Sequence, residues 1–422
     1  MAISVDEALR LVIDSVRPLG VERVPIREAL GRVLAENISS PRDIPGFDNS
    51  AMDGYAVRAS DVAGAAENRP ARLFIIETIA AGGIPTRTVE PGHASRIMTG
   101  APIPVGADAI VPVERTRSEA DTVEIMATAP AGQFVRPRGE DLREGEPVMA
   151  AGQLLHPGDI GTLASVNRSI IDVYRRPRVA LVATGDELID IDRSPTGAQV
   201  VNSSAYGLYA AVAEAGGEAV MLKIARDLEE ETRARLAEAS TFDLALSTGG
   251  VSAGQFDYVQ TALDDLGMRQ LFHGVLQRPG RPLKYGLIDG RPFFGLPGNP
   301  VSTMVCFFLY VRPAILKMTG RSDLSLPRVR VRCAVDIRKT PKLTEFIRVK
   351  IERRGAILEA RPTGNQSSGA MSSVGRADGL LIGPVALDVI PAGTEADVLM
   401  LSYNTTADCE PFFEDRIRRQ TL

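Results

Sequence analysis

The chain has 422 residues, more than one hydrophobic core usually serves, so two to four domains are expected. It is 44% hydrophobic and 24% charged, and its formal net charge of -5 argues against a general nucleic-acid binder. Three separated cysteines and three isolated histidines form no disulfide framework, zinc site or histidine-based triad. The N-terminal residues lack a signal-peptide pattern, and the apolar window 301–316 is too short to span a membrane. A cytoplasmic protein without a membrane segment is therefore expected.

The N-terminal part predicts helices followed by a contact loop. Residues 4–17 place apolar side chains on one helical face, and a second short helix is predicted around residues 26–34. The segment 40–55 contains turn-forming residues, apolar anchors and the carboxylates Asp48 and Asp53. It is expected to be either a loop shaped for contact or a packed loop between domains.

The next part predicts a β domain inserted into a helical one. Residues 56–138 form short strands separated by glycine and proline, and residues 147–174 contain a helix start. We therefore predict a segmented helical domain made of residues 1–44 and 141–176, with a small β domain, residues 45–140, inserted between the two segments.

Residues 177–326 are predicted to form a three-layer α/β domain with a mostly parallel sheet. Strands at 178–184, 219–225 and 243–247 alternate with helical patterns, as in βαβ units. Residues 327–422 predict a C-terminal β domain. Its cations alternate with apolar residues, which favours a solvated sheet face over a ligand surface; they are Arg328, Arg330, Arg332, Arg338, Lys339, Lys342, Arg348 and Lys350.

Ligands of open α/β sheets bind at the carboxyl ends of the strands. A glycine-rich loop follows strand 243–247, and it is either a tight turn or a cradle of N–H groups for a phosphate. The neighbouring loops end at the same edge. The candidate substrate contacts of these loops are Thr184, Gly185, Ser247, Gly249, Gly250, Ser252, Pro297, Gly298, Asn299 and Pro300.

The same edge should gather carboxylates. Asp186, Glu187, Asp227 and Asp257 all follow strands of this sheet or begin the next element. Hard oxygen ligands without nearby Cys or His suit Mg²⁺, which also takes phosphate oxygens. Glu187, Asp227 and Asp257 are the candidate metal ligands, whereas Asp186 is expected to be a helix N-cap.

The segment 276–284 carries three cations between prolines: Arg278, Arg281 and Lys284. It is expected either to neutralise a polyanion beside the metal or to be a surface loop with incidental charge.

Seven motifs follow one another over nearly the whole chain: PGFDNSAMDGYA (45–56), RIMTGAPIPVGADAIVPVE (96–114), RPRGEDLREGE (136–146), VALVATGDEL (179–188), STGGVSAGQFDYV (247–259), RPGRP (278–282) and GLPGNPVS (295–302). Together they resemble the molybdopterin molybdenumtransferases, the MoeA family that includes the E domain of gephyrin. The resemblance implies four domains, the last of them barrel-like, in an elongated homodimer. It also implies insertion of molybdenum from molybdate into adenylated molybdopterin, with release of AMP and a requirement for Mg²⁺ or a similar divalent ion.

The resemblance further implies site residues. Asp53 and Thr99 of one subunit would face Glu187, Asp227 and Asp257 of the partner subunit, and the motif positions Asp141, Pro297, Pro300, Arg348 and Ser373 are functional as well. The chain departs from the family where lysines are common, at Arg278 and Arg281, and where an acidic residue is common, at Gln255. The alternatives are a molybdopterin adenylyltransferase, otherwise the upstream partner in this pathway, and a non-catalytic pterin-binding scaffold. Nothing in these motifs distinguishes molybdate from tungstate.

Overall fold

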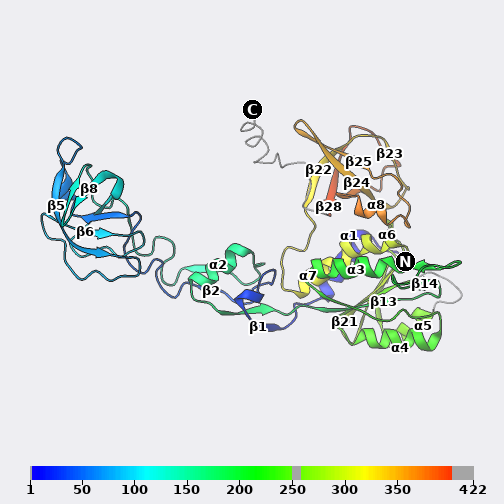
Figure 1. Ribbon diagram of the computed structural model, residues 1–422. Helices are drawn as coiled ribbons and strands as arrows, with labels where there is room; N and C mark the ends of the chain where they lie inside the picture. The colour runs from blue at the N-terminus through cyan, green and yellow to red at the C-terminus, as the bar shows by residue number, and fades with distance from the viewer. Residues whose placement is uncertain (1, 250–257, 402–422) are drawn as a thin grey trace. The chain divides into compact units, whose positions relative to one another are not determined.

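A computed structural model of the chain describes residues 2–249 and 258–401. The chain divides into two compact units (Figure 1). Unit 1 consists of Met1–Arg23, Gly31–Ala35 and Asp172–Leu422, and unit 2 consists of Val24–Leu30 and Glu36–Ile171. The strands β1 (Val21–Pro25) and β12 (Ile170–Tyr174) carry the chain from one unit to the other.

Unit 2 contains a six-stranded sheet, as the strand-and-turn pattern predicts. Its order is β7-β4-β6-β5-β9-β8, and its pairs are antiparallel except for the parallel pair β5–β6. Gly54 lies at the start of β4, where an added Cβ would be 2.1 Å from the carbonyl oxygen of Val111 on the neighbouring strand. A side chain is therefore excluded there. The strands are β4 (Gly54–Val57), β5 (Ala71–Ile79), β6 (His93–Ile97), β7 (Ala109–Pro112), β8 (Thr116–Glu119) and β9 (Thr122–Ile125), with 3-10 turns η2 (Ala59–Val62) and η3 (Val113–Arg115).

The rest of unit 2 is less helical than its sequence predicts. The helix α2 (Pro157–Ser165) begins with a capping box at His156 and Asp159. The predicted helix over residues 26–34 is wrong: a 3-10 turn, η1 (Ile26–Glu28), occupies part of it. Gly31 follows with φ of 71°, and Leu30 is 56% exposed, so the apolar spacing does not correspond to a buried helical face. Two short ladders complete the unit: β2 (Ile38–Ser39) with β11 (Pro147–Met149), and β3 (Asn49–Ser50) with β10 (Val135–Arg136).

Unit 1 contains the α/β domain that the alternating pattern predicts. Its sheet has the order β16-β13-β17-β21-β20-β18, in which the first four strands are parallel and β20 is antiparallel to both of its neighbours. The strands are β13 (Arg178–Ala183), β16 (Glu218–Met221), β17 (Leu244–Thr248), β18 (Arg269–His273), β20 (Lys284–Ile288) and β21 (Arg291–Leu296), and a short parallel pair, β14 (Leu188–Ile189) with β15 (Val200–Val201), follows β13.

Helices cover both faces of this sheet (Figure 1). One face packs against α1 (Val5–Ser15), α3 (Ser203–Glu214), α6 (Pro300–Cys306) and α7 (Arg312–Met318), and the other packs against α4 (Glu229–Ser240) and α5 (Tyr258–Asp265). A π-helical turn, η4 (Phe307–Val311), joins α6 to α7. Within the described part of the chain, Pro300–Met318 is the one helical stretch long and apolar enough to cross a membrane, and 83% of its most apolar window is buried in the protein. The structure therefore places it in the core, as predicted for 301–316.

Helix α1 belongs to this core. Its apolar residues Ala8, Val12 and Val16 are buried among side chains of the α/β domain, and Lys317 Nζ donates to the carbonyl of Ile13 at 2.6 Å. The sequence assigned this helix to the segmented helical domain. The sequence predicts the apolar face of this helix, but it does not predict that the α/β domain covers that face.

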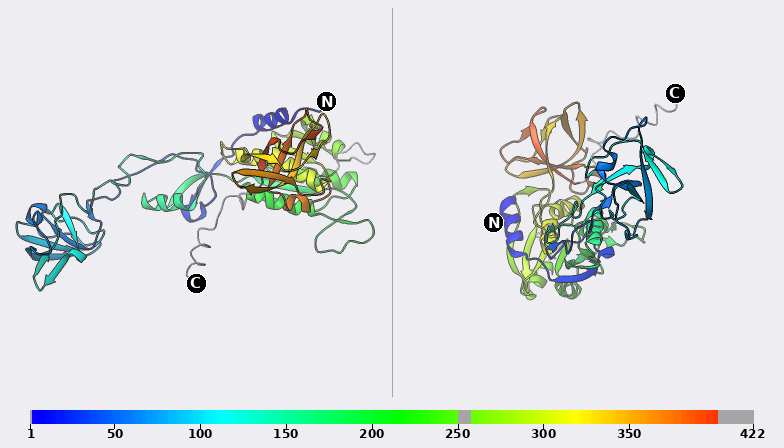
Figure 2. Two further views of the ribbon diagram at one scale, coloured as in Figure 1. Left: turned by 90° about the horizontal axis from the view of Figure 1, so that it is seen from above. Right: turned by 90° about the vertical axis from the view of Figure 1, so that its left-hand side faces the viewer.

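The C-terminal domain is a small barrel, seen in yellow to red in Figure 2. Its strands follow the order β24-β25-β22-β28-β26, and β26 pairs back with β24 to close the ring. A sixth strand, β19 (Gln277–Arg278), comes from the α/β domain and pairs parallel with β24. The other strands are β22 (Arg328–Cys333), β24 (Thr344–Arg354), β25 (Ile357–Pro362), β26 (Gly379–Gly383) and β28 (Glu395–Met400), with the pair β23 (Ile337–Arg338) and β27 (Val389–Ile390) and the short helix α8 (Ser372–Gly375).

Candidate functional site

The loops that leave the carboxyl edge of the parallel strands lie side by side, as the sequence predicts. The N–H and hydroxyl groups of Thr184 donate to the carbonyl of Thr248 at 3.0 and 3.3 Å, and the N–H of Gly185 donates to Ala225 at 3.1 Å. An added Cβ at Gly249 would be 2.7 Å from the carbonyl oxygen of Thr184. This close contact, with φ of 91° at Gly249, requires glycine.

The loop after β21 joins the same edge. An ideal Cβ on Gly298 would be 3.6 Å from Cα of Gly249, so the two glycine loops touch. Thr303 in α6 holds this loop, because its hydroxyl donates to the carbonyls of Pro297 at 2.6 Å and of Asn299 at 3.1 Å. Gly298 and Asn299 are exposed, and Pro300 begins α6. Hydrogen bonds from Thr303 therefore hold the loop in place, while Gly298 and Asn299 remain exposed to solvent.

The carboxylates at this edge are exposed and close to one another. Asp186 Oδ1 accepts a hydrogen bond from the N–H of Asp227 at 3.2 Å, and the carboxylate of Glu187 lies within 2.8 Å of the position of an added Cβ on Gly185. The predicted N-cap role of Asp186 is wrong, because β13 leads into β14 and helix α3 is capped by Asn202. Asp186 instead fixes the neighbouring loop.

The proposed metal site is described only in part. Glu187 and Asp227 offer the oxygen donors that Mg²⁺ prefers, but Asp257, like Gly250, Ser252 and Gln255, lies outside the described residues. Among residues 2–249 and 258–401, no three His, Cys, Asp or Glu side chains gather as a metal-binding group. The predicted three-carboxylate set therefore stays a prediction.

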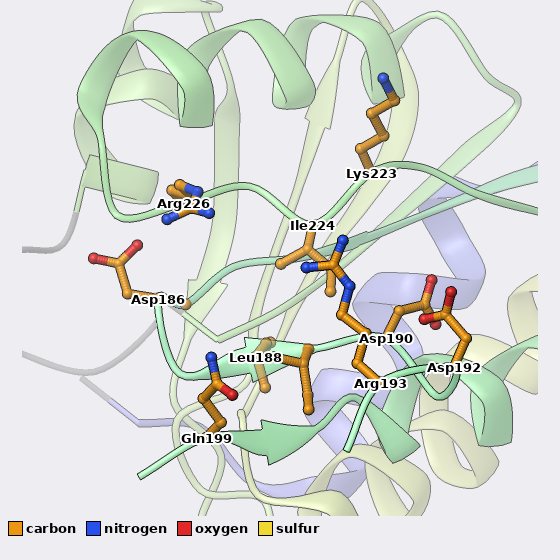
Figure 3. A pocket seen from close by; sticks show the side chains of 11 residues that line it. Asp186, Leu188, Asp190, Asp192, Arg193, Gln199, Lys223, Ile224 and Arg226 are labelled. Carbon is orange, nitrogen blue, oxygen red and sulfur yellow. The ribbon is translucent and has the colours of Figure 1, made fainter. Parts of the chain in front are cut away.

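A pocket of about 350 Å³ opens beside these carboxylates. Figure 3 shows Asp186 and Arg226 on one side of it and Asp190, Asp192 and Arg193 on the other. The volume lies within the range of small-molecule sites. The pocket is lined by both acidic and basic side chains. Besides the residues already named, its lining consists of Gly185, Leu188, Ile189, Gln199, Lys223 and Ile224.

A separate cluster of cations, here called the cationic site, lies where the α/β domain meets the barrel. Arg348 on β24 is only 2% exposed, so its predicted place on a solvated sheet face is wrong. Its guanidinium donates to Ser373 Oγ at 3.1 Å and to the carbonyls of Ser367 at 3.1 Å and Asn365 at 3.4 Å. No carboxylate forms an ion pair with Arg348 among the described residues. Burial lowers the pKa of this guanidinium, and the carboxylate of Glu345 opposes that effect.

Arg278 lies close to this group on β19. Its guanidinium donates to Thr340 Oγ1, and its Nε is 3.8 Å from Glu345 Oε1. Glu345 is 8% exposed and accepts the N–H of Thr340 at 2.6 Å. Arg278 pairs in the sheet with Glu345, which precedes Arg348 by three residues on β24. Arg281, in the same loop, is exposed.

Lys284 lies apart from the two arginines. It is the first residue of β20, is 1% exposed, and its Nζ donates to Gln260 Oε1 on α5. In the sheet it pairs with Gly295, which pairs with Ser247 on the next strand. Ser247 Oγ is buried and accepts or donates no hydrogen bond among the described residues. Both side chains thus lie at the ligand edge, beneath the loops.

Unit 2 holds the other predicted residues. Asp53, directly before β4, accepts hydrogen bonds at its Oδ1 from the hydroxyl and from the N–H of Thr99, both at 2.7 Å. These bonds, the hydroxyl first, lower the pKa of Asp53, so it is a carboxylate at neutral pH. Both residues are exposed, as is Asp141, whose N–H donates to Ile44 at 2.9 Å. The pair Asp53–Thr99 is a preformed surface feature of this unit.

The predictions omitted three residues that shape the cationic site: Gln277, Thr340 and Glu345. Their importance depends on the pairing of β19 with β24. No local signal marks a two-residue strand that joins a second domain.

The fold and sites define a multidomain protein with an α/β domain whose loops at the carboxyl edge of a parallel sheet form a candidate ligand site. Residues 3–167 match the MoeA N-terminal region (domain I and II), residues 180–317 a probable molybdopterin-binding domain, and residues 330–401 the MoeA C-terminal region (domain IV). The chain belongs to the MoeA family.

Named relatives cover nearly the whole chain. A molybdopterin molybdenumtransferase of Synechococcus elongatus is 36% identical over 411 residues, 95% of this chain and 100% of the relative. One from a Nostoc species is 35% identical over 386 residues, 90% of this chain and 88% of the relative. The crystal structure of a molybdopterin biosynthesis MoeA protein from Pyrococcus horikoshii matches with a TM-score of 0.80 at 30% identity, covering 95% of this chain and 100% of that one.

Proposed function

We propose that this chain inserts molybdenum from molybdate into adenylated molybdopterin and releases AMP. The observation that carries the proposal is the buried Arg348, which donates to Ser373 and forms no carboxylate ion pair among the described residues, in a chain whose residues 180–317 match a probable molybdopterin-binding domain. A buried cation of this kind needs an anion, and a second substrate that is a small oxyanion supplies one.

Arg278, Arg281, Arg348 and Ser373 are the proposed molybdate ligands. A guanidinium offers several N–H donors in a planar fork, and this suits the oxygens of a tetrahedral dianion. The low exposure of Arg348 strengthens the interaction, because the surrounding dielectric is lower than that of water. Positions 278 and 281 carry arginines where the family commonly has lysines. Because a guanidinium is planar, molybdate binding is expected to depend more on the orientation of these side chains than it would with lysine ammonium groups.

The loops at the carboxyl edge are the proposed site for the adenylated pterin. Gly298 and Asn299 are exposed at this edge, and the pocket beside Asp186 is lined by the cations Lys223 and Arg226, which suit anionic phosphate oxygens. Mg²⁺ held by Glu187, Asp227 and Asp257 would stabilise negative charge on the phosphate that leaves with AMP. The protein residues bind and orient the two substrates, so no protein nucleophile is required.

The proposed enzyme is a cytoplasmic homodimer with a shared site. Asp53, Thr99 and Asp141 lie on unit 2, which suits a contribution to the site of the partner subunit. An adenylyltransferase acting on the same pterin would supply the substrate. Mixing two inactive variants, Asp53→Ala and Glu187→Ala, tests the sharing: a heterodimer regains one intact site, so about a quarter of wild-type activity should return. No recovery in mixed dimers would exclude the shared site.

The central experiment measures AMP release from adenylated molybdopterin with Mg²⁺, with and without molybdate. Molybdate-dependent release with a molybdenum–pterin product supports the proposal. Binding of the pterin without release would assign the chain to the scaffold class. ATP-dependent formation of the adenylate would make it an adenylyltransferase.

A further inference from the structure

A buried polar cluster supports the loop that carries Arg278 and Arg281. It consists of Gln277, Cys306 and Tyr310, and each of these side chains is 0% exposed. Gln277 comes from β19, Cys306 from the end of α6 and Tyr310 from the π-helical turn η4. Their surroundings are the apolar core of the α/β domain. We refer to these three residues as the loop-support cluster.

The hydrogen bonds of the cluster end on the backbone between the two arginines. Gln277 Nε2 donates to the carbonyl of Pro279 at 2.9 Å, and Cys306 Sγ donates to the carbonyl of Gly280 at 3.6 Å. Gln277 Nε2 also lies 3.7 Å from Cys306 Sγ. Tyr310 Oη donates to Gln277 Oε1 and thereby orients the amide, so that its NH₂ group points to the loop.

Gly280 shows how closely the loop rests on the cluster. Its φ is 95°, and an added Cβ would lie 2.5 Å from Cys306 Sγ and 2.7 Å from Gln277 Nε2. Two loop carbonyls and one loop Cα are therefore fixed from the core side. Arg278 and Arg281, at the two ends of the same short segment, are both exposed.

Cys306 and Tyr310 can serve as hydrogen-bond donors because both side chains are protonated at neutral pH. Burial raises the pKa of the Cys306 thiol and of the Tyr310 hydroxyl far above neutrality, so both groups keep the proton that they donate. Apolar side chains of similar shape would fill the same space. They would leave the carbonyls of Pro279 and Gly280 without a donor.

We propose that Gln277, Cys306 and Tyr310 are positioning residues, which set the backbone of the Arg278–Arg281 loop so that its two guanidinium groups converge on one oxyanion. This inference rests on the proposed function of the loop. The cluster acts through the arginines and does not touch the anion. Its expected effect is on molybdate affinity and not on the chemical step.

The test replaces Tyr310 by phenylalanine and uses Tyr285→Phe as the matched control. Tyr285 is equally buried in the same core, and its hydroxyl is bonded to one side chain, Ser15 Oγ, at 2.6 Å. Both variants remove one buried hydroxyl, so similar falls in melting temperature are expected. Only Tyr310→Phe releases the Gln277 amide and the loop.

Isothermal titration calorimetry with molybdate should give a Kd about tenfold higher for Tyr310→Phe, equivalent to about 1.4 kcal/mol. Gln277→Met should behave in the same way, whereas Tyr285→Phe should keep the wild-type Kd. In the AMP-release assay, the KM for molybdate should rise while kcat at saturation stays within about twofold.

If the wild type binds molybdate and both cluster variants bind it equally well, the inference is wrong and the cluster serves stability alone. An equal loss in Tyr285→Phe would also overturn it, because the effect would then be that of any buried hydroxyl. A wild-type protein that binds no molybdate would refute the proposed function first, and the inference with it.

Discussion

Replacing Arg348 by methionine separates the binding role of this residue from its role in stability. The change removes a buried charge and three hydrogen bonds and keeps an unbranched side chain. Two of the bonds end on carbonyls of the exposed residues Asn365 and Ser367. A buried charge that forms no ion pair among the described residues is costly to keep out of water, and methionine removes that cost. We therefore expect an equal or higher melting temperature.

Molybdate binding should change in the opposite direction. Hydrogen bonds to a charged group contribute about 1.5–3 kcal/mol, which corresponds to a Kd about 10- to 150-fold higher in Arg348→Met. Melting curves with and without molybdate, together with calorimetric titration, measure both effects. At a hundredfold excess over Kd, molybdate should stabilise the wild type by about 2.7 kcal/mol, and between about half and about nine-tenths of that gain should be lost in the variant.

Arg330→Met is the matched control. This arginine lies in the same domain, is exposed, and pairs with Asp397 at 3.1 Å and with Glu395 at 3.4 Å. Its loss should change stability by no more than about 0.5 kcal/mol and leave the Kd unchanged. A lower melting temperature for Arg348→Met with an unchanged Kd would refute the reasoning and make Arg348 a structural residue.

Three further changes test other parts of the molecule. Glu187→Gln should raise the Mg²⁺ concentration needed for half-maximal AMP release by about tenfold or more without weakening pterin binding; an unchanged Mg²⁺ dependence would remove Glu187 from the metal site. Gly54→Ala should destabilise unit 2 by about 3 kcal/mol or more in thermal melts, because its Cβ would overlap a carbonyl, whereas Gly64→Ala, with no atom within 4 Å, should be neutral. Burial raises the pKa of Tyr285 to about 12 from its ordinary value of 10.0. The folded protein therefore keeps this proton longer than the unfolded chain, so stability should fall by about 1.4 kcal/mol per pH unit between these values. In Tyr285→Phe this part of the alkaline loss should be absent, and an unchanged slope would contradict the assignment.

The sequence is sufficient for most of the fold, because strand and helix patterns in residues 177–320 differ clearly in period and length. The order of the parallel strands places the loops after β13, β17 and β21 at one edge, and the structure confirms this convergence. Short segments are less predictable. Residues 26–34 have helical spacing, yet Gly31 and the exposed Leu30 accompany a single 3-10 turn.

The candidate site, like the fold, could be predicted from the sequence only in part. The loop residues and the arginines of the RPGRP segment are recognisable by type and position, but the burial of Arg348 is not. It alternates with apolar residues like any solvated cation, and only the pairing of β19 with β24 brings it beside Arg278. Contacts between segments more than sixty residues apart leave no local pattern. The capping role predicted for Asp186 failed for a related reason, since the element after β13 is a strand.

The strand β19 also determines what a shorter version of this protein can do. Because it extends the barrel with two residues from the α/β domain, the proposed oxyanion site is divided between two segments of the chain. A protein truncated after residue 326 would retain Arg278 and Arg281, but Thr340, Glu345, Arg348 and Ser373 would all be lost. The α/β module alone thus has the loops for a pterin phosphate without the enclosure for a second, inorganic substrate. On the proposed assignment, the barrel completes the binding site for the inorganic substrate, because it supplies Arg348 and Ser373.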